Sequence, residues 1–370
     1  MEIAQTNMNI LIDIGHPAHV HLFRHLIADL REEGITPLVT VKDLPSATQL
    51  LDNFGIPYTC IGSKSDSLRG KIAKQLLFDK ILYGLVKRHK IDLAVGTSMT
   101  IAHVSRLTKM KSIVLDDDDG SVQPLFVKFA HPFADVLMSP DVLAAERVKP
   151  GHVVYPGYHE LAYLHPKRFT PDPEVPKKAG IRHGESYFVM RFNAFKAHHD
   201  RGVHGLSFEQ KMELIRLLEP HGKIFITTEG EIDPQLKKYQ LTVPPEEAHS
   251  LLYYASMFVG DSQTMTSEAA VLGTPALKCN SLAGRLSVAN QLEDAYNMSF
   301  AFQPDDYPLM KAKVQELLAM PDPKKEWARR KEGLLRDKID VTAFICWFVK
   351  NFPRSLEEYR TDSELFKRFH

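Results

Sequence analysis

The chain has 370 residues, of which 44% are hydrophobic and 25% charged, so it is long enough for two domains with full hydrophobic cores. Its 46 Lys and Arg residues balance 46 Asp and Glu residues, which argues against nucleic acid as the main partner. No segment is apolar for long enough to span a bilayer, and residues 1–9 lack the pattern of a signal peptide. The three cysteines are scattered and fit neither a disulfide framework nor a metal site, so we expect a cytoplasmic protein. Peripheral membrane contact and a homodimer stay open.

The N-terminal part of the chain alternates apolar strand-like runs with helix-like runs from Ile10 onwards. This alternation predicts an α/β fold, in which a doubly wound parallel sheet carries helices on both faces. The expected strands cover 10–14, 36–41, 57–61, 93–95, 112–115 and 136–138, and the expected helices cover 19–33, 46–54, 68–89, 101–108 and 122–130. Ligands of such sheets bind at the carboxyl ends of the strands. The loops Gly15–His19, Gly96–Thr100 and Asp116–Ser121 each follow a strand, so we expect them to line one cleft.

Five prolines between residues 156 and 176 interrupt this alternation, and we interpret residues 161–182 as an inter-domain linker. The alternation then restarts, with expected strands at 187–192, 223–228, 257–259 and 275–279 and expected helices at 207–218, 246–255, 268–272 and 286–293. We therefore predict two Rossmann-like domains that face each other across a cleft, at residues 8–160 and 183–330. Helices within residues 331–370 are expected to pack back on the N-terminal domain.

The most informative loop follows the apolar strand Met257–Val259 and reads Gly260-Asp261-Ser262-Gln263-Thr264 before a short helix-like run. A helix that begins directly after a strand presents unpaired backbone N–H groups, and with the helix dipole these form a site for phosphate oxygens. Glu268 follows within the helix and is a candidate to hydrogen-bond a sugar hydroxyl such as that of a ribose. The alternative is an ordinary turn in which Ser262 or Thr264 caps the helix.

Two runs carry a resemblance to known families. The run Asp261–Thr264, with Ser267-Glu268 and Gly273-Thr274-Pro275 behind it, resembles the donor-site signature of GT-B-fold enzymes. It is similar in particular to the loop of non-hydrolysing UDP-N-acetylglucosamine 2-epimerases, which reads Asp-Ser-Gly-Gly followed by Glu-Glu and Gly-Lys-Pro. The run Asp13-Ile14-Gly15-His16-Pro17-Ala18-His19-Val20-His21 resembles the domain-of-unknown-function 354 family. The resemblance covers nearly the whole chain and implies a GT-B-like fold.

The resemblance also implies roles for single residues in the second domain. Ser262, Gln263 and Thr264 would face the diphosphate of a nucleotide-sugar substrate, a UDP-sugar by likeness, and Glu268 would face its ribose. Gln263 and Thr264 replace the two glycines of the epimerase loop, so the phosphate would lie differently or be held by side chains. Two further residues complete the expected donor site: Arg191 as a cationic phosphate clamp, with an ordinary ion pair as the alternative, and Gln291 at the donor sugar. No cofactor is expected.

The acidic run Asp116–Asp119 follows an apolar strand. Adjacent carboxylates repel one another, which raises the pKa of some of them when a cleft holds them together. Asp117 and Asp118 are our candidates for a catalytic acid or base, and a solvated surface loop is the alternative. Hard oxygen ligands also suit magnesium, but GT-B enzymes generally need no metal for the donor phosphates, and we expect none here.

The same run supports a rival hypothesis. Asp117-Asp118-Asp119-Gly120-Ser121-Val122 resembles the nucleophile motif of haloacid-dehalogenase-like phosphatases, and Gly260-Asp261-Ser262 resembles their later magnesium motif. Two departures count against this minor alternative. The second aspartate of the later motif is missing at Met265 and Thr266. The nucleophile of that family also lies on its first core strand, whereas several strand–helix units come first here.

Histidines follow the first strand. His16 lies in the loop itself and is our candidate general base for an acceptor hydroxyl, because an imidazole titrates near neutral pH. His19, with Thr97 and Ser98 from the loop after the fourth strand, is expected to bind the acceptor. The spacing of His16, His19 and His21 fits no standard zinc pattern. His198 and His199, after the first strand of the second domain, are further cleft candidates.

Three functions therefore stay open besides the phosphatase. The first is a nucleotide-sugar-dependent glycosyltransferase of surface polysaccharide or glycoconjugate biosynthesis. The second is a sugar-nucleotide epimerase, but two epimerase motifs are altered here. The epimerase run His-Gly-Asp-Thr-Thr-Thr corresponds to Val95–Thr100, which has no carboxylate, and the epimerase run His-x-Glu-Ala-Gly corresponds to the acidic run. Asp117 or Asp118 is a potential substitute. The third is a non-catalytic sugar-nucleotide-binding protein, which would bind a nucleotide without turnover.

Overall fold

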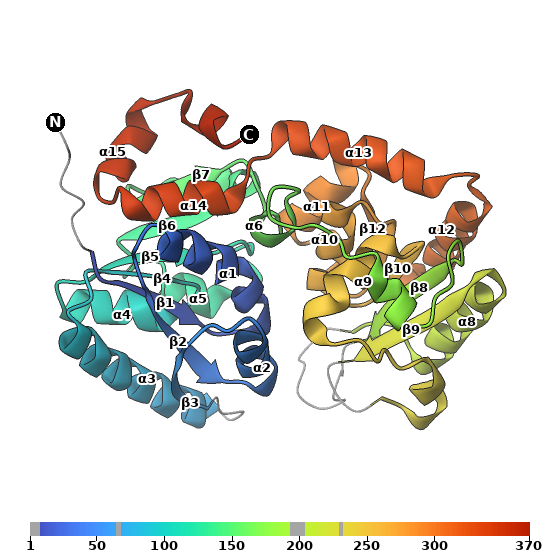
Figure 1. Cartoon of the computed structure of the whole chain (residues 1–370), viewed down its shortest axis with the longest axis horizontal. Helices are drawn as coiled ribbons and strands as arrows, with labels where there is room; N and C mark the ends of the chain where they lie inside the picture. The colour runs from blue at the N-terminus through green and yellow to red at the C-terminus, as the bar shows by residue number, and fades with distance from the viewer. Residues whose placement is uncertain (1–7, 64–67, 193–203, 229–231) are drawn as a thin grey trace. The chain divides into compact units, whose positions relative to one another are not determined.

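The computed structural model describes residues 8–63, 68–192, 204–228 and 232–370 (Figure 1). The chain divides into two compact units. Unit 1 comprises Met1–Tyr163 and Ile339–His370, and unit 2 comprises Leu164–Lys338. Each unit holds its own parallel sheet, so the expected α/β class with two Rossmann-like domains is confirmed.

Unit 1 is built on a seven-stranded parallel sheet with the order β3-β2-β1-β4-β5-β6-β7. Its strands are β1 (Ile10–Ile14), β2 (Leu38–Asp43), β3 (Thr59–Ser63), β4 (Leu93–Gly96), β5 (Lys111–Leu115), β6 (Val136–Pro140) and β7 (His152–Tyr155). Its helices are α1 (Pro17–Glu32), α2 (Pro45–Asn53), α3 (Leu68–His89), α4 (Met99–Leu107), α5 (Pro124–Phe129), α14 (Val341–Lys350) and α15 (Arg354–Thr361), and α6 (Leu161–Leu164) ends at the boundary with unit 2. β1 is buried along its whole length, as continuous apolar strands of parallel sheets are.

Unit 2 has a five-stranded parallel sheet with the order β12-β11-β10-β8-β9. Its strands are β8 (Tyr187–Phe192), β9 (Lys223–Thr228), β10 (Met257–Gly260), β11 (Ala276–Cys279) and β12 (Ser299–Phe302). Its helices are α7 (Glu174–Lys178), α8 (Phe208–Leu218), α9 (Ala248–Tyr254), α10 (Gln263–Leu272), α11 (Ser287–Asp294), α12 (Tyr307–Ala319) and α13 (Pro323–Asp337). Short 3₁₀ helices occupy Asp141–Glu146 and Leu365–Phe369 in unit 1, and Glu219–His221, Pro234–Tyr239, Pro245–Glu247 and Pro304–Asp306 in unit 2.

Local sequence signals explain several of these boundaries. His16 is the N-cap of α1, and Pro17 occupies the first helical position, where the missing N–H costs nothing. A capping box between Ser207 and Gln210 begins α8. Gly273, with a φ of 86°, ends α10 in the left-handed conformation that glycine adopts most easily.

The structure also differs from the expected elements. β7 and β12 had not been predicted; each lies at the edge of its sheet and is only partly buried, whereas the equally short strands β4 and β10 are buried along their whole length. Residues 161–182 are not a plain linker but carry α7, which packs against α9. α13 belongs to unit 2, because its buried Trp327 donates a hydrogen bond of 2.8 Å to the carbonyl of Met298, so the C-terminal part of unit 1 begins only at Ile339.

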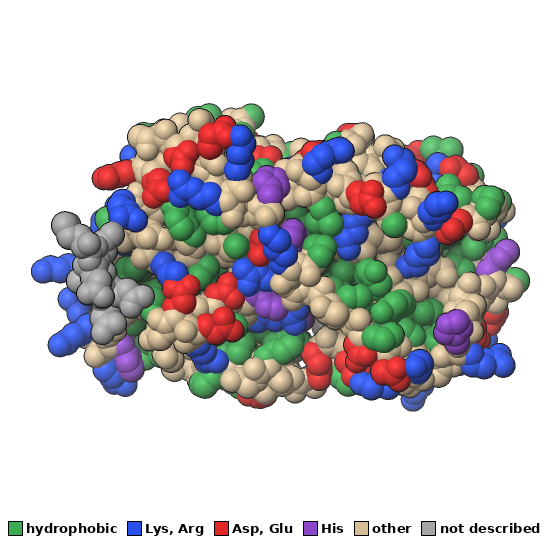
Figure 2. Space-filling model, turned by 45° about the horizontal axis from the view of Figure 1, so that its top comes forward, with side chains coloured by type: hydrophobic (Ala, Val, Ile, Leu, Met, Phe, Trp, Pro, Cys, Tyr) green, Lys and Arg blue, Asp and Glu red, His purple; other side chains and the backbone are tan. Residues whose placement is uncertain are grey.

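On the face shown in Figure 2, acidic and basic side chains are mixed over most of the surface, consistent with equal numbers of the two charges. None of the helices within the described residues is long and apolar enough to cross a membrane.

Candidate functional site

The predicted phosphate loop lies where β10 ends and α10 begins. β10 approaches its neighbour β8 closely, since a Cβ atom on Gly260 would lie 2.3 Å from the carbonyl oxygen of Arg191. Ser262 is the N-cap of α10, yet among the described residues its side chain makes no capping hydrogen bond. Its carbonyl instead accepts a hydrogen bond of 2.6 Å from Thr266 Oγ1. Ser262 therefore occupies the N-cap position without a side-chain capping bond, and the alternative of an ordinary strand-to-helix turn stays open. Thr264 is exposed on the first turn of α10, and the role of this turn as an anion site stays a prediction.

A buried lysine lies beneath this loop. Lys278 on β11 is 1% exposed, and its Nζ donates a hydrogen bond to Oε1 of Gln263. Gln263 in turn donates from Nε2 to Ser267 Oγ at 3.2 Å. Burial lowers the pKa of Lys278 to about 8, although the charge of Glu293 opposes this shift. Sequence reasoning missed Lys278; the available signal was a lysine within the apolar run Pro275–Cys279.

Glu268 lies in α10 but is buried and already engaged. Its Oε1 is 3.0 Å from Nε2 of His249 on α9, and both side chains are less than a tenth exposed. The ring of Phe169 meets the His249 ring edge-on with centroids 6.3 Å apart. This partner of Glu268 was not foreseen, and the role of Glu268 at a ribose stays a prediction.

The remaining donor-site candidates occupy separate elements of unit 2. Arg191 is half-buried near the end of β8, where its Nη1 donates to Thr227 Oγ1 at 3.2 Å. Gln291 is half-buried on α11. His198 and His199 lie outside the described residues. The roles of Arg191 and Gln291 at a donor stay predictions.

In unit 1, a buried carboxylate ties three strands together. Asp13 on β1 is fully buried and accepts hydrogen bonds from Thr40 Oγ1 on β2, at 2.7 Å, and from Ser98 Oγ after β4. β1 and β4 also approach closely, because a Cβ atom on Gly96 would lie 2.7 Å from the carbonyl oxygen of Asp13. Ser98, predicted to bind an acceptor, thus has a structural contact inside the sheet.

The loops after β1 and β4 bring His16, His19 and Thr97 together, as the sequence predicted. The rings of His16 and His19 lie 5.7 Å apart. Nδ1 of His16 accepts a hydrogen bond of 3.2 Å from the Ala18 N–H, and His16 is exposed. His19 Nδ1 accepts from the Gly15 N–H at 3.3 Å and lies 2.6 Å from Thr97 Oγ1. His19 and Thr97 therefore form one polar group at this end of the sheet.

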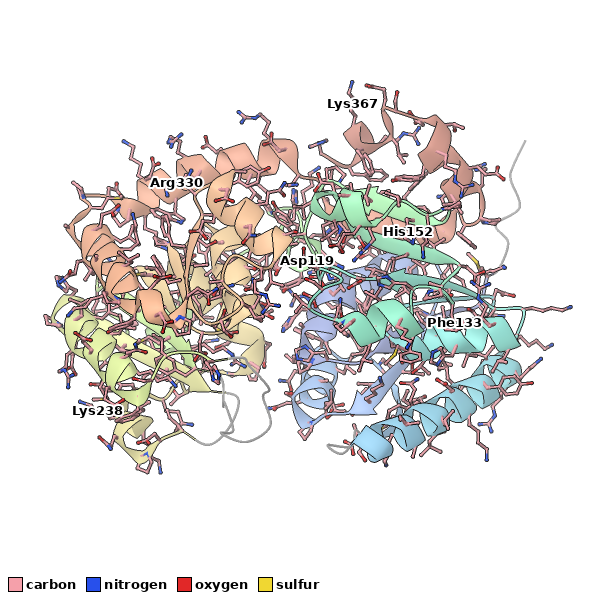
Figure 3. All side chains as sticks on the ribbon, turned by 180° about the vertical axis from the view of Figure 1, so that it is seen from behind. Asp119, Phe133, His152, Lys238, Arg330 and Lys367 are labelled. Carbon is pink, nitrogen blue, oxygen red and sulfur yellow. The ribbon has the colours of Figure 1, made fainter. Side chains whose placement is uncertain are left out.

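The four aspartates after β5 have different surroundings. Asp116 is a buried anchor, which accepts hydrogen bonds from His131 Nε2 at 2.7 Å, from Arg147 Nη2 at 3.0 Å and from Gln123. Arg147 also donates to the Asp118 carbonyl at 3.0 Å, so it fixes the backbone of the run. Asp119, labelled in Figure 3, is also buried. The run is therefore an ordered, partly buried turn rather than a solvated loop.

Asp117 forms an ion pair that sequence reasoning missed. Its Oδ2 lies 3.1 Å from Nδ1 of His159, which follows β7. Burial acts to raise the pKa of Asp117, but the charge and hydrogen bond of His159, with the charge of His19, outweigh it and leave the pKa below its ordinary value. For His159, burial acts to lower the pKa, and Asp117 more than compensates, so that the pKa is raised. The available signal was a histidine directly after the Tyr155-Pro156-Gly157-Tyr158 run, which sequence reasoning had assigned to the end of a domain.

Two buried polar atoms belong to the surroundings of this pair. Among the described residues, the buried Nε2 of His159 and the buried hydroxyl of Tyr155 have no hydrogen-bond partner.

Asp118 has an exposed side chain, while desolvation and the negative charges of Asp117 and Asp116 raise its pKa to about 7. The side chain of Asp118 keeps contact with water, so repulsion by the neighbouring aspartates Asp117 and Asp116 is the main cause of this raised pKa.

Within the described part of the chain, no group of three or more His, Cys, Asp or Glu side chains could hold a metal ion.

Comparison with known proteins confirms the expected family and fold. The family model described as protein of unknown function (DUF354) matches residues 8–303. An uncharacterized protein of Methanocaldococcus jannaschii is 25% identical over 290 residues, which cover 74% of this chain and 82% of that protein.

Solved structures of similar fold include two kinds of enzyme. A Listeria monocytogenes protein, provisionally described as a UDP-N-acetylglucosamine 2-epimerase, has a TM-score of 0.68 and 12% identity, covering 94% of this chain and 97% of that chain. The Neisseria meningitidis UDP-GlcNAc 2-epimerase bound to UDP-GlcNAc has a TM-score of 0.66 and 13% identity, covering 92% and 99%. The glycosyltransferase SsfS6 of Streptomyces sp. SF2575 has a TM-score of 0.60 and 12% identity, covering 93% and 100%. At these identities the likeness shows the fold.

Proposed function

Because the chain belongs to the DUF354 family and shares its fold with sugar-nucleotide enzymes, we propose that it is a nucleotide-sugar-dependent, glycosyltransferase-like enzyme. The observation that carries this proposal is the first turn of α10 with the buried Lys278 beneath it. A helix N-terminus and a nearby cation together attract the diphosphate of a nucleotide sugar. Uridine is the proposed base, since the Neisseria meningitidis enzyme was solved with UDP-GlcNAc.

Unit 2 is the donor-binding domain in this proposal. Ser262, Gln263 and Thr264 bind the diphosphate with their backbone N–H groups or side chains, and Lys278 adds charge through Gln263. Glu268 binds the ribose. Arg191 and Gln291 complete the site at the phosphate and at the sugar.

Unit 1 is the acceptor domain and supplies the proton transfer. Asp118, with a pKa of about 7, takes the proton from the acceptor hydroxyl, since a base with a pKa near the working pH is most effective. Asp117 keeps His159 protonated, and the buried Nε2–H of His159 donates a hydrogen bond to the bound substrate. His16, His19 and Thr97 orient the acceptor, and Ser98 holds their loop through Asp13. The reaction would belong to cytoplasmic synthesis of a surface polysaccharide or glycoconjugate.

Calorimetric titration with UDP, GDP, dTDP and CMP, in magnesium and in EDTA, tests the donor site. Saturable binding of one diphosphate without metal would support the proposal, and binding of none would overturn it. Slow hydrolysis of the corresponding UDP-sugar then indicates a transferase that lacks its acceptor. Binding without any turnover of a series of UDP-sugars, with or without acceptor glycans, would favour a non-catalytic binding protein instead.

A sugar-nucleotide epimerase is the second candidate. It is favoured by the TM-scores of 0.68 and 0.66 for the two epimerase-type structures, against 0.60 for the glycosyltransferase. The Gly96-Thr97-Ser98 turn lacks the carboxylate that the epimerases carry in this run, which is evidence against epimerase activity. Incubation with UDP-N-acetylglucosamine alone distinguishes the two, because an epimerase forms a second sugar nucleotide without an acceptor. The acidic run follows the fifth strand of its unit rather than the first, which is evidence against the phosphatase alternative.

A further inference from the structure

Exposed apolar side chains gather on one side of unit 1. Ten large hydrophobic side chains are exposed among the described residues, and eight of them lie on or beside α3, α4 and α5. These eight are Ile72, Leu76, Leu77, Tyr83, Leu107, Leu125, Phe129 and Phe133, and we call the area that they form the α3–α5 surface. Scattered single apolar residues need no explanation, but a concentration of this kind marks an interaction site.

The three helices of this surface are joined to one another. His103 on α4 lies 2.9 Å from Asp79 of α3 through Nδ1 and 2.8 Å from the Phe129 carbonyl at the end of α5 through Nε2. Its ring also meets the ring of Phe133 edge-on, with centroids 5.5 Å apart. Phe133 is labelled in Figure 3, which shows it on the side of unit 1 that also carries α3 and α5. The three helices that carry the exposed apolar side chains are therefore linked neighbours in unit 1.

The spacing on α3 places three of its four exposed apolar residues along one side of the helix. Ile72, Leu76 and Tyr83 are four and seven residues apart, which aligns them along one side of a helix. Leu76 is 66% exposed, and Leu125 on α5 is 61% exposed. α5 has no fully buried residue, and its Leu125 and Phe129 are exposed.

The charge of this surface is positive. Lys80, Lys87, Arg88 and Lys128 are exposed on α3 and α5. The three helices carry only one carboxylate, Asp79, and His103 is paired with it. Two of the lysines lie against exposed aromatic rings, with Lys87 Nζ 5.6 Å from the Tyr83 ring and Lys128 Nζ 5.4 Å from the Phe129 ring. Such lysines rest their carbon chains on apolar surface and keep the ammonium group in a polar layer.

We propose that the α3–α5 surface binds a lipid bilayer that carries anionic headgroups. Apolar side chains at the level of the acyl chains, with lysines and aromatic rings at the headgroups, are the arrangement by which proteins lie on a membrane without crossing it. A second copy of the chain is the less favoured occupant, because two positive surfaces repel each other. The chemistry of the nucleotide-sugar site plays no part in this contact.

Sedimentation of the full-length protein with vesicles tests this proposal. We expect binding to vesicles of phosphatidylcholine with phosphatidylglycerol, weaker binding at high salt, and little binding to phosphatidylcholine alone. The single variants Leu76→Glu and Leu125→Glu should each reduce vesicle binding about tenfold or more. Each removes an apolar side chain that the bilayer would bury and adds a negative charge that anionic headgroups repel. The matched controls Val148→Glu and Leu309→Glu, which alter the two exposed apolar residues outside this surface, should bind like the wild type.

Charge variants separate the electrostatic contribution. Lys80→Glu and Lys87→Glu should each weaken binding about fivefold or more, whereas Lys237→Glu on unit 2 should leave it unchanged. Circular dichroism of each variant checks that it is folded. The proposal is overturned if neither type of vesicle binds, or if the Leu76→Glu and Leu125→Glu variants bind as tightly as the controls. It is also overturned if the protein dimerises and Leu76→Glu abolishes the dimer, because a second copy then covers the surface.

Discussion

The buried pair of Glu268 and His249 gives the sharpest test of the donor site. A hydrogen bond to a charged carboxylate contributes about 1.5–3 kcal/mol, and the 3.0 Å distance and deep burial place this pair within that range. We expect a double-mutant cycle of Glu268→Ala and His249→Ala to give a coupling energy of about 2 kcal/mol. Each single variant should lose about 3 kcal/mol of unfolding free energy, because it leaves a buried polar partner behind.

Urea unfolding followed by tryptophan fluorescence measures these energies. Trp327 reports on the unfolding of unit 2. A Trp347→Phe background removes the tryptophan of unit 1, so that the fluorescence change does not average the unfolding of the two units. A coupling energy below about 0.5 kcal/mol would refute the reasoning. The milder variants Glu268→Gln and His249→Gln then test the ribose contact. If Glu268 binds the ribose, Glu268→Gln weakens binding of UDP much more than binding of 2′,3′-dideoxy-UDP, whereas His249→Gln affects both ligands equally.

Three further predictions concern turnover, charge and packing. Turnover should rise with pH through about 7 as Asp118 loses its proton, and it should fall at higher pH as His159 loses its own. Asp118→Asn should lower kcat by about 10²–10⁴-fold and leave nucleotide binding unchanged. If the pH–rate profiles show that this variant is as active as the wild type, Asp118 is not the base. UDP affinity should fall as pH rises through about 8, because Lys278 then loses its charge, and Lys278→Met should bind UDP about tenfold more weakly at pH 7 and lack this dependence in calorimetry. Since the pKa of Lys278 is depressed from 10.5, the unfolding free energy of the wild type should also rise from pH 8 towards 10.5, and a flat profile would contradict the burial argument. Gly96→Ala should destabilise unit 1 by about 1–3 kcal/mol, because its Cβ meets the Asp13 carbonyl, whereas the control Gly84→Ala on α3, with open space around it, should be neutral or stabilising in urea unfolding.

The alternation of apolar strands and amphipathic helices was enough to predict the fold class. β1 is an apolar run interrupted only by Asp13, and α1 begins where a proline follows the N-cap, so local signals define both elements. The strands β7 and β12 were not predicted because they are partly buried edge strands, which lack the buried apolar run that marks the equally short β4 and β10. The assignment of α13 depends on the contact of Trp327 with Met298, which no local pattern contains.

The candidate site was harder to predict from the sequence than the fold, because it also depends on contacts between residues far apart in the chain. The loop residues Ser262 and Asp117 could be proposed because turns after apolar strands are recognisable. Their partners could not be found, because His159 pairs with an aspartate 42 positions earlier and His249 with a glutamate 19 positions later, so only the folded chain brings them together.

The chain enters unit 1, leaves it and returns, and this path has a consequence for synthesis on the ribosome. α14 packs against α1, and its Thr342 Oγ1 donates a hydrogen bond of 2.6 Å to the Ala162 carbonyl. α14 emerges only after all of unit 2 has been translated, so unit 2 is the first unit whose sequence is complete. Until then unit 1 lacks a helix of its core and exposes the apolar surface that this helix covers. A nascent chain that stalls between Phe302 and Ile339 would therefore be a substrate for chaperones, although it already contains the strands β1 to β12 of both sheets.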